Sequence, residues 1–146
     1  MTELVPLEVT DGLRGLTLHG PWGWAIMQGH KRVENRSWET PFRGRFAIHV
    51  GKSQTSDAQA LADFQALGLD YPEVFPRGAI IGTVELVDIL PLDRFLAQFG
   101  QEEMDRTFAL GPFCWVLRRP VPCIPVRCPG NFQLWRVRDQ LARLQR

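Results

Sequence analysis

Residues 29–52 read GHKRVENRSWETPFRGRFAIHVGK, and this stretch decides the fold that we expect. In residues 31–38 the even positions are polar or aromatic and share one face, while Val33 points to the other, which is the two-residue period of a β-strand. A turn at residues 39–44 follows. Residues 45–50 then alternate again and place three apolar side chains on one face: Phe46, Ile48 and Val50. We therefore predict a hairpin-like pair of strands with one apolar and one polar face.

The same stretch contains Lys31 and Lys52, which are the only lysines among the chain's 17 lysine and arginine residues. Lysine offers a compact, rotatable charge whose pKa falls on burial, whereas arginine stays protonated. In a chain that otherwise uses arginine, we expect lysine to be kept where a guanidinium does not serve. Both lysines are therefore candidate functional residues.

The chain has 146 residues, of which 45% are hydrophobic and 23% are charged, as in an ordinary soluble globular protein. We expect residues 1–146 to form a single domain with a core of its own. No apolar run approaches the roughly 18 residues of a membrane span, and the mixed, acidic start differs from a signal peptide, so we expect a cytoplasmic protein. The three cysteines, Cys114, Cys123 and Cys128, match no metal or disulfide spacing. We expect buried thiols rather than a disulfide or a metal site.

The net charge of +1 conceals an uneven distribution of charge along the chain. Residues 30–52 carry +4, residues 53–111 carry −7 and residues 114–146 carry +6. The two basic segments either converge into one positive cleft, which would suit a phosphate-bearing partner, or form two solvated faces that never meet.

The rest of the chain predicts short strands alternating with short helices. Strands are expected at residues 12–20, 78–90 and 113–126, and helices at residues 21–29, 56–69, 91–108 (one or two helices) and 138–146. Prolines at positions 120, 122 and 125 interrupt the last strand and favour an edge strand or a bent arm. Short strands mixed with short helices indicate an α+β fold, a small barrel with helices inserted between its strands.

Residues 21–52 resemble the signature of the ASCH domain, a module of the PUA-like superfamily. The signature combines a helix that begins near Pro-Trp, a G-x-K-x-x-E-x-R segment and an R-G-x-x-x-I-H strand. The matching residues here are Pro21, Trp22, Gly29, Lys31, Glu34, Arg36, Arg43, Gly44, Ile48 and His49. The resemblance implies a PUA-like β-pseudobarrel of about five to six short strands with flanking short helices. It also implies a cleft beside the first helix that takes RNA or a nucleotide.

The resemblance implies three kinds of activity among family members: RNA binding, proposed ribonuclease activity and hydrolysis of acylated cytidine. The amidohydrolases resemble G-x-K-x-x-T with a threonine nucleophile, whereas this chain has Glu34 there, and a carboxylate does not readily replace that hydroxyl. We therefore expect an RNA- or nucleotide-binding module without a cofactor or metal. The alternatives are a metal-independent ribonuclease or amidohydrolase, and a protein-interaction domain that regulates transcription or translation through the acidic helices of residues 92–108.

The candidate catalytic residues are Lys31, Glu34 and Lys52, with His49 as a possible helper. Lys31 and Glu34 lie three residues apart, so their side chains can meet across the turn. The pair is expected to act as an acid/base unit, to hold the cleft open for an anion, or to form a structural ion pair. We expect the pair to be partly exposed and to contribute only about 0–1 kcal/mol to folding. Removal of Lys31 should then affect the ligand and leave the fold intact.

Other side chains offer contacts that a nucleotide needs. Trp22 or Trp38 could stack on a base, and Glu34 and Arg36 could contact a base amino group and a phosphate, unless Glu34 forms a cross-strand ion pair with Arg45. His49 serves either proton transfer or structure, and its spacing from the other histidines resembles no metal motif. The expected ligand-binding set is Trp22, Lys31, Glu34, Arg36, Trp38, Arg43, His49, Lys52 and Asn131.

Overall fold

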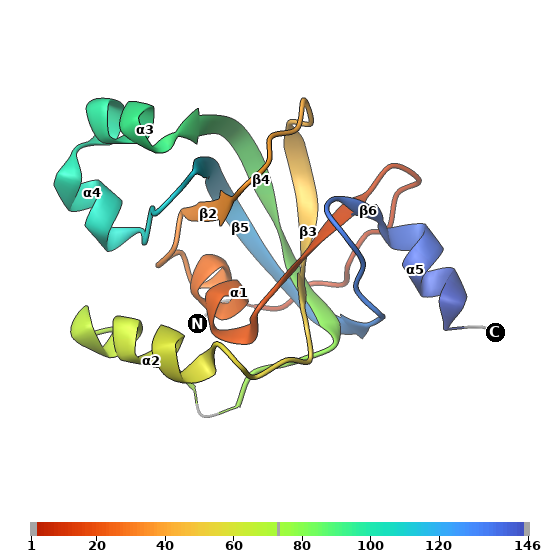
Figure 1. The fold of residues 1–146 in the computed structure, drawn as a ribbon. Helices are drawn as coiled ribbons and strands as arrows, with labels where there is room; N and C mark the ends of the chain where they lie inside the picture. The colour runs from red at the N-terminus through yellow and green to blue at the C-terminus, as the bar shows by residue number, and fades with distance from the viewer. Residues whose placement is uncertain (1–2, 73, 145–146) are drawn as a thin grey trace.

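The computed structural model describes residues 3–72 and 74–144, which form a six-stranded mixed sheet and five helices (Figure 1). The strand order is β2-β5-β4-β3-β1-β6. The strands are β1 Arg14–Leu18, β2 Val33–Arg36, β3 Gly44–Val50, β4 Ala79–Pro91, β5 Phe113–Arg127 and β6 Trp135–Arg136. The helices are α1 Gly20–Met27, α2 Asp57–Ala66, α3 Leu92–Phe99, α4 Gln101–Arg106 and α5 Val137–Arg143. The predicted α+β class is confirmed.

The predicted hairpin between residues 31–38 and 45–50 is wrong. β2 pairs antiparallel with β5, with Val33 opposite Val116, whereas β3 lies between β1 and β4. Alternation alone identifies both strands but not their partners. The two strands are consecutive in sequence but are separated by two other strands, β5 and β4, in the sheet.

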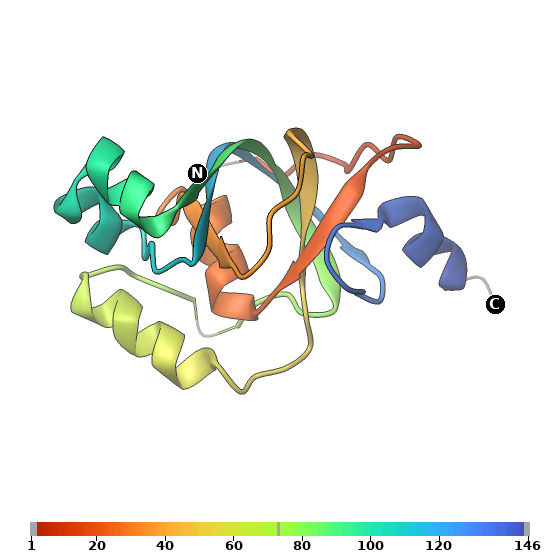
Figure 2. The ribbon, with the colours of Figure 1, turned by 45° about the horizontal axis from the view of Figure 1, so that its top comes forward.

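β4 and β5 have 13 and 15 residues, lie within one residue of the expected bounds and form the central ribbon of the sheet. Three register shifts in their pairing mark bulges, which bend and twist a ribbon of this kind. The sheet curls, and β2 comes to face β1 across the open side of a pseudobarrel (Figure 2).

The prolines of β5 do not interrupt the strand, which is continuous from Phe113 to Arg127. β2 covers only residues 113–116 of β5, so the prolines at 120, 122 and 125 lie where that side of β5 has no strand beyond an isolated bridge between Val5 and Cys123. The prediction of an edge strand therefore holds for the proline-containing half of β5 and fails for the half that β2 covers.

The core lies inside the curled sheet and under α1. Leu16, Phe46, Ile48 and Trp115 are at most 1% exposed, and burial of such side chains stabilises the fold by about 1.5–3 kcal/mol each. α1 packs closely on β4 because Gly82 has no side chain: a Cβ there would overlap Met27 Sδ and lie 2.7 Å from the carbonyl oxygen of Val121. This close packing fixes α1, and therefore the position of its first turn beside β2.

All three cysteines are buried and free, as expected. Within the described residues, no three His, Cys, Asp or Glu side chains lie together in a way that could hold a metal ion. None of the helices in the described part of the chain has both the length and the apolar character to cross a membrane.

Candidate functional site

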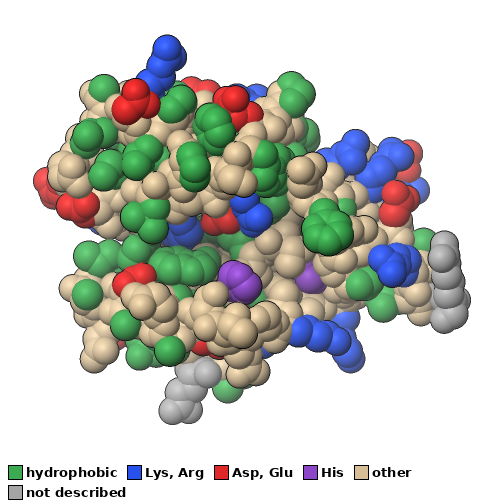
Figure 3. Space-filling model, viewed as in Figure 1, with side chains coloured by type: hydrophobic (Ala, Val, Ile, Leu, Met, Phe, Trp, Pro, Cys, Tyr) green, Lys and Arg blue, Asp and Glu red, His purple; other side chains and the backbone are tan. Residues whose placement is uncertain are grey.

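A pocket of about 390 Å³ opens between the start of α1 and β2. Four short segments line it: residues 17–19 at the end of β1, Trp22 on α1, residues 34–36 on β2 and residues 51–53 after β3. On the face drawn in Figure 3, a hollow crosses the middle of the molecule, and basic, acidic and histidine side chains gather in it. The pocket therefore combines charge of both signs with an aromatic wall.

The first turn of α1 contributes a positive end to this pocket. His19 is the N-cap residue and Pro21 lies in the first turn, which contains no acidic residue and no side-chain cap. The unpaired N–H groups at a helix start carry a partial positive charge that attracts anions. Because His19 and Trp22 both line the pocket, this end of the helix faces it.

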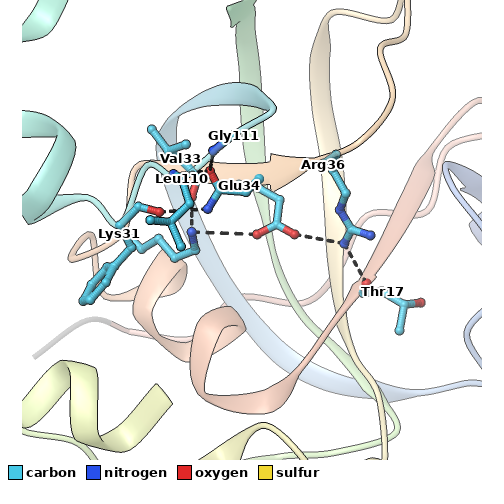
Figure 4. A network of polar contacts seen from close by, with 9 residues as sticks. Thr17, Lys31, Val33, Glu34, Arg36, Leu110 and Gly111 are labelled. Atoms are coloured by element: carbon cyan, nitrogen blue, oxygen red, sulfur yellow. Dashed lines mark hydrogen bonds and ion pairs between the residues drawn. The ribbon is translucent and has the colours of Figure 1, made fainter. Parts of the chain in front are cut away.

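Glu34 lies at the centre of the polar network of the site (Figure 4). Its Oε2 atom is 3.0 Å from Arg36 Nη2, and its Oε1 atom is 3.9 Å from Lys31 Nζ. The side chain is only 11% exposed. β2 holds it in place through the pairing of Glu34 with Trp115 on β5. A nearly buried carboxylate between two cations is thus aimed at the pocket.

Arg36 bridges the open side of the pseudobarrel. Its Nη2 atom donates a hydrogen bond of 2.9 Å to the carbonyl oxygen of Thr17 on β1, in addition to its contact with Glu34. Its Nε atom is buried and has no hydrogen-bond partner among the described residues. Since a guanidinium has five N–H donors, Arg36 keeps donors for a ligand after it has joined the two strands.

Lys31 lies behind Glu34 rather than in the pocket. Its side chain is 3% exposed, Nζ donates to the carbonyl oxygen of Val33, and Nζ lies 5.3 Å from the centre of the Trp22 ring. Burial lowers the pKa of Lys31, and the Glu34 carboxylate opposes that effect. The expectation of a partly exposed Lys31–Glu34 pair is therefore wrong. The alternative pair of Glu34 with Arg45 is wrong too, because Arg45 donates to Thr83 on β4.

Asn35 has a role that sequence reasoning missed. Its Nδ2 atom donates to the carbonyl oxygen of Phe108, and its Oδ1 atom accepts from the backbone N–H groups of Leu110 and Gly111 at 2.8 and 2.9 Å. Asn35 thus fixes the segment after α4 against β2. Nothing in the sequence near Asn35 predicts this, because its partners lie more than 70 residues away.

The pocket brings together four of the residues expected to bind a ligand: Trp22, Glu34, Arg36 and Lys52. It also contains Thr17, His19 and Ser53, which were not expected. His19 could have been found from sequence, because it directly precedes the Gly-Pro start of the first helix. Both cations on the pocket wall, Arg36 and Lys52, come from the first basic segment, and none of the described residues 114–144 of the second basic segment lines the pocket.

Two expected ligand-binding residues, Trp38 and Arg43, lie away from this pocket. Trp38 packs edge-on against Trp115 at 4.7 Å between ring centres and lines a different pocket. Arg43 lies in the exposed turn before β3, with Nη2 3.7 Å from Asp88.

Two more expected ligand-binding residues, His49 and Asn131, do not line the pocket. The His49 ring is buried, with Nε2 2.7 Å from the carbonyl oxygen of Cys128 and Nδ1 3.2 Å from Thr17 Oγ1, and burial lowers its pKa. Asn131 Nδ2 lies 3.5 Å from the amide oxygen of Gln140. The contacts of both side chains are with other parts of the fold.

The sequence matches the ASCH domain family over residues 16–126, which is most of the chain. The chain belongs to this family. It is 31% and 32% identical to proteins called activating signal cointegrator 1 from Homo sapiens and Mus musculus, over 143 residues in each case. These matches cover 92% of this chain and 24% of the relatives, so the ASCH chain spans about a quarter of the length of the curated relatives it matches.

The fold of this ASCH domain is shared with the crystal structure of ASCH from Zymomonas mobilis. The TM-score is 0.55 at 17% sequence identity, and the match covers 93% of this chain and 95% of that one. The predicted ASCH resemblance and the predicted fold are thus both confirmed.

Proposed function

We propose that this ASCH domain binds single-stranded RNA and holds one nucleotide in the pocket between α1 and β2. The observation that carries the proposal is the convergence of an aromatic ring, a nearly buried carboxylate, two cations and a helix start on one pocket. These are the groups that recognise a base, its amino group and its phosphate.

The base would lie against Trp22 and Glu34. Stacking of a base on an aromatic side chain contributes roughly 1–3 kcal/mol to binding. Glu34 accepts hydrogen bonds only, so it favours a base that presents an amino group, such as cytosine or adenine. Lys31 and Arg36 hold the carboxylate in position, and the pocket therefore needs little rearrangement to receive the base.

The phosphate would lie between Lys52, Arg36 and the first turn of α1. The backbone N–H of Gly51 donates to the carbonyl oxygen of Leu18 at 2.8 Å, which holds the chain next to Lys52 against the end of β1. Lys52 itself is exposed, so its ammonium can approach a ligand. Helix starts and cations are the usual partners of phosphate groups in proteins.

We propose binding rather than turnover because of the position of Lys31. An acid/base lysine must reach the ligand, whereas this one is 3% exposed behind Glu34. Its place in the network is that of a support for Glu34 and Trp22.

The test is fluorescence anisotropy with a labelled single-stranded RNA at low and at moderate salt. We expect the logarithm of the affinity to fall linearly with the logarithm of the salt concentration, with a slope of about −0.7 for each phosphate that is neutralised. Lys52→Ala and Trp22→Leu should weaken binding several-fold. Arg94→Ala, which removes an exposed charge from α3, is the matched control and should have no effect.

Two outcomes would overturn the proposal. One is the absence of detectable binding at low salt, or binding that does not change with salt. The other is turnover of labelled RNA or of acylated cytidine in the presence of a chelator, if Glu34→Gln abolishes it, because the pocket would then be an active site.

A further inference from the structure

A second pocket of about 340 Å³ lies at the opposite end of β1 from the first. Its walls come from the start of β1, from residues 38–42 after β2 and from residues 133–134 before β6. Arg14 and Trp38 supply a cation and an aromatic ring, and Glu39, Thr40 and Gln133 supply polar groups. The pocket therefore repeats the kinds of side chain that line the first one.

The two pockets follow the same seam between β1 and the segment that starts at β2. The first pocket contains Thr17 from β1 and Arg36 from the facing segment, and the second contains Arg14 and Trp38. The hydrogen bond from Arg36 to Thr17 crosses the seam beside the first pocket. Three residues of a strand span about 10 Å, so the two pockets are close enough for a short single strand to occupy both.

Arg14 carries an unusual charge arrangement. It pairs directly with Arg136 across the β1–β6 ladder, which places two like charges on one face of the sheet. Over residues 3–72 and 74–144, neither arginine forms an ion pair, whereas Arg43, Arg77 and Arg138 each contact a carboxylate. Like charges opposite each other are unfavourable in a sheet, and a bound phosphate between them would remove the repulsion.

An exposed aromatic side chain lies in the loop that leads to β6. Phe132 is 90% exposed, so its ring is free to contact a ligand. It directly precedes Gln133, which lines the second pocket. Exposed aromatic rings and cationic side chains are the groups with which proteins hold unpaired bases without reading their sequence, and Phe132 lies four residues before Arg136 in the chain.

We propose that the second pocket is a further nucleotide subsite, so that the ligand is a single-stranded polynucleotide laid along β1 rather than a free nucleotide. This inference rests on the proposed function of the first pocket and names the class of ligand. Arg14 and Arg136 contact the phosphates, and Trp38 and Phe132 pack against bases. The second basic segment thus contributes through Arg136, at this subsite and not at the first one.

The test compares a mononucleotide with single strands of increasing length, up to about eight nucleotides, in competition against the labelled RNA. We expect affinity to rise with length over the first few nucleotides. Arg14→Gln and Phe132→Ala should weaken binding of the longer strands about three- to tenfold and leave binding of the mononucleotide unchanged. Arg14→Gln should also reduce the slope of affinity against salt concentration by the amount expected for about one phosphate contact. Arg94→Ala is the matched control, and the melting temperature of each variant shows whether it is folded.

The outcomes separate this inference from the proposed function. If Lys52→Ala weakens all ligands while affinity is independent of length and of Arg14, the subsite is refuted and the first pocket stands. If the longer strands depend on Arg14 but not on Lys52 or Trp22, the proposed function of the first pocket fails.

Discussion

Replacement of Lys31 by methionine should destabilise the fold, because it removes the ammonium and keeps most of the side-chain volume. The carbonyl oxygen of Val33 loses its buried donor, at a cost of about 1–3 kcal/mol. Breaking a buried ion pair costs about 3–5 kcal/mol, but Glu34 keeps Arg36 at 3.0 Å, so the cost should lie near the lower limit. We expect a loss of about 3 kcal/mol, which for a chain of this length lowers Tm by about 10 °C.

The assay is urea denaturation followed by tryptophan fluorescence, with Lys52→Met as the matched control at the other, exposed lysine. The control should stay within about 0.5 kcal/mol of the wild-type protein. The double variant Lys31→Met/Glu34→Gln should lose less than the sum of the two single variants, because both changes act on one ion pair. If Lys31→Met lowers the free energy of unfolding by less than about 1 kcal/mol, the reasoning is refuted, because a change of that size is typical of a solvent-exposed ion pair.

Three further predictions follow from buried groups. Burial lowers the pKa of His49 below its ordinary value of 6.5, so the unfolded chain takes up a proton first as the pH drops. The free energy of unfolding should therefore fall below pH 6.5, and His49→Gln should flatten this dependence in urea titrations at several pH values; an unchanged dependence would contradict the burial of His49. Burial raises the pKa of the Cys128 thiol to about 11. In the native protein at neutral pH this thiol should therefore resist alkylation, measured by mass spectrometry, and should react only after denaturation. Fast alkylation of the native protein at Cys128 would contradict its burial. Gly82→Ala should lower the free energy of unfolding by about 1–3 kcal/mol, because the new methyl group would overlap Met27 Sδ. The measurement is a thermal melt, in which an unchanged Tm would show that α1 can move away from β4.

The sequence predicts the elements of this fold better than their partners. The alternation of residues 45–50 and the β-branched run of residues 78–90 identify β3 and β4, because each strand buries one of its faces by a local rule. The predicted hairpin of β2 and β3 was wrong because alternation does not specify pairing partners: β2 pairs with β5 and β3 pairs with β4, which come later in the sequence. The prolines do not interrupt β5 as expected, because a proline excludes a strand only where a neighbouring strand needs its N–H.

The candidate site was predicted where the side chains belong to one local segment. Glu34 and Arg36 share a face of β2, and the alternation places them together without any knowledge of the fold. Burial of Lys31 could not be foreseen, because it depends on Trp22 and on the carbonyl oxygen of Val33 closing around it. His49 was left open between proton transfer and structure, and its contacts agree with the structural alternative; the sequence could not name its partner, because the carbonyl oxygen of Cys128 is 79 residues away.

The pairing of β2 with β5 has a consequence for the nascent chain on the ribosome. Residues 34–36 of β2 line the pocket. β2 pairs with residues 113–116 of β5, which are synthesised about 80 residues later. At a synthesis rate of roughly 5–20 residues per second, the strand that pairs with β2 follows Glu34 after about 4–16 s. Until then β2 lacks the strand with which it pairs, and a fragment that ends before β5 carries the signature residues without that support. The ligand binding that we propose would therefore be acquired late in synthesis, although all the residues that line the pocket lie in the first 53 positions of the chain.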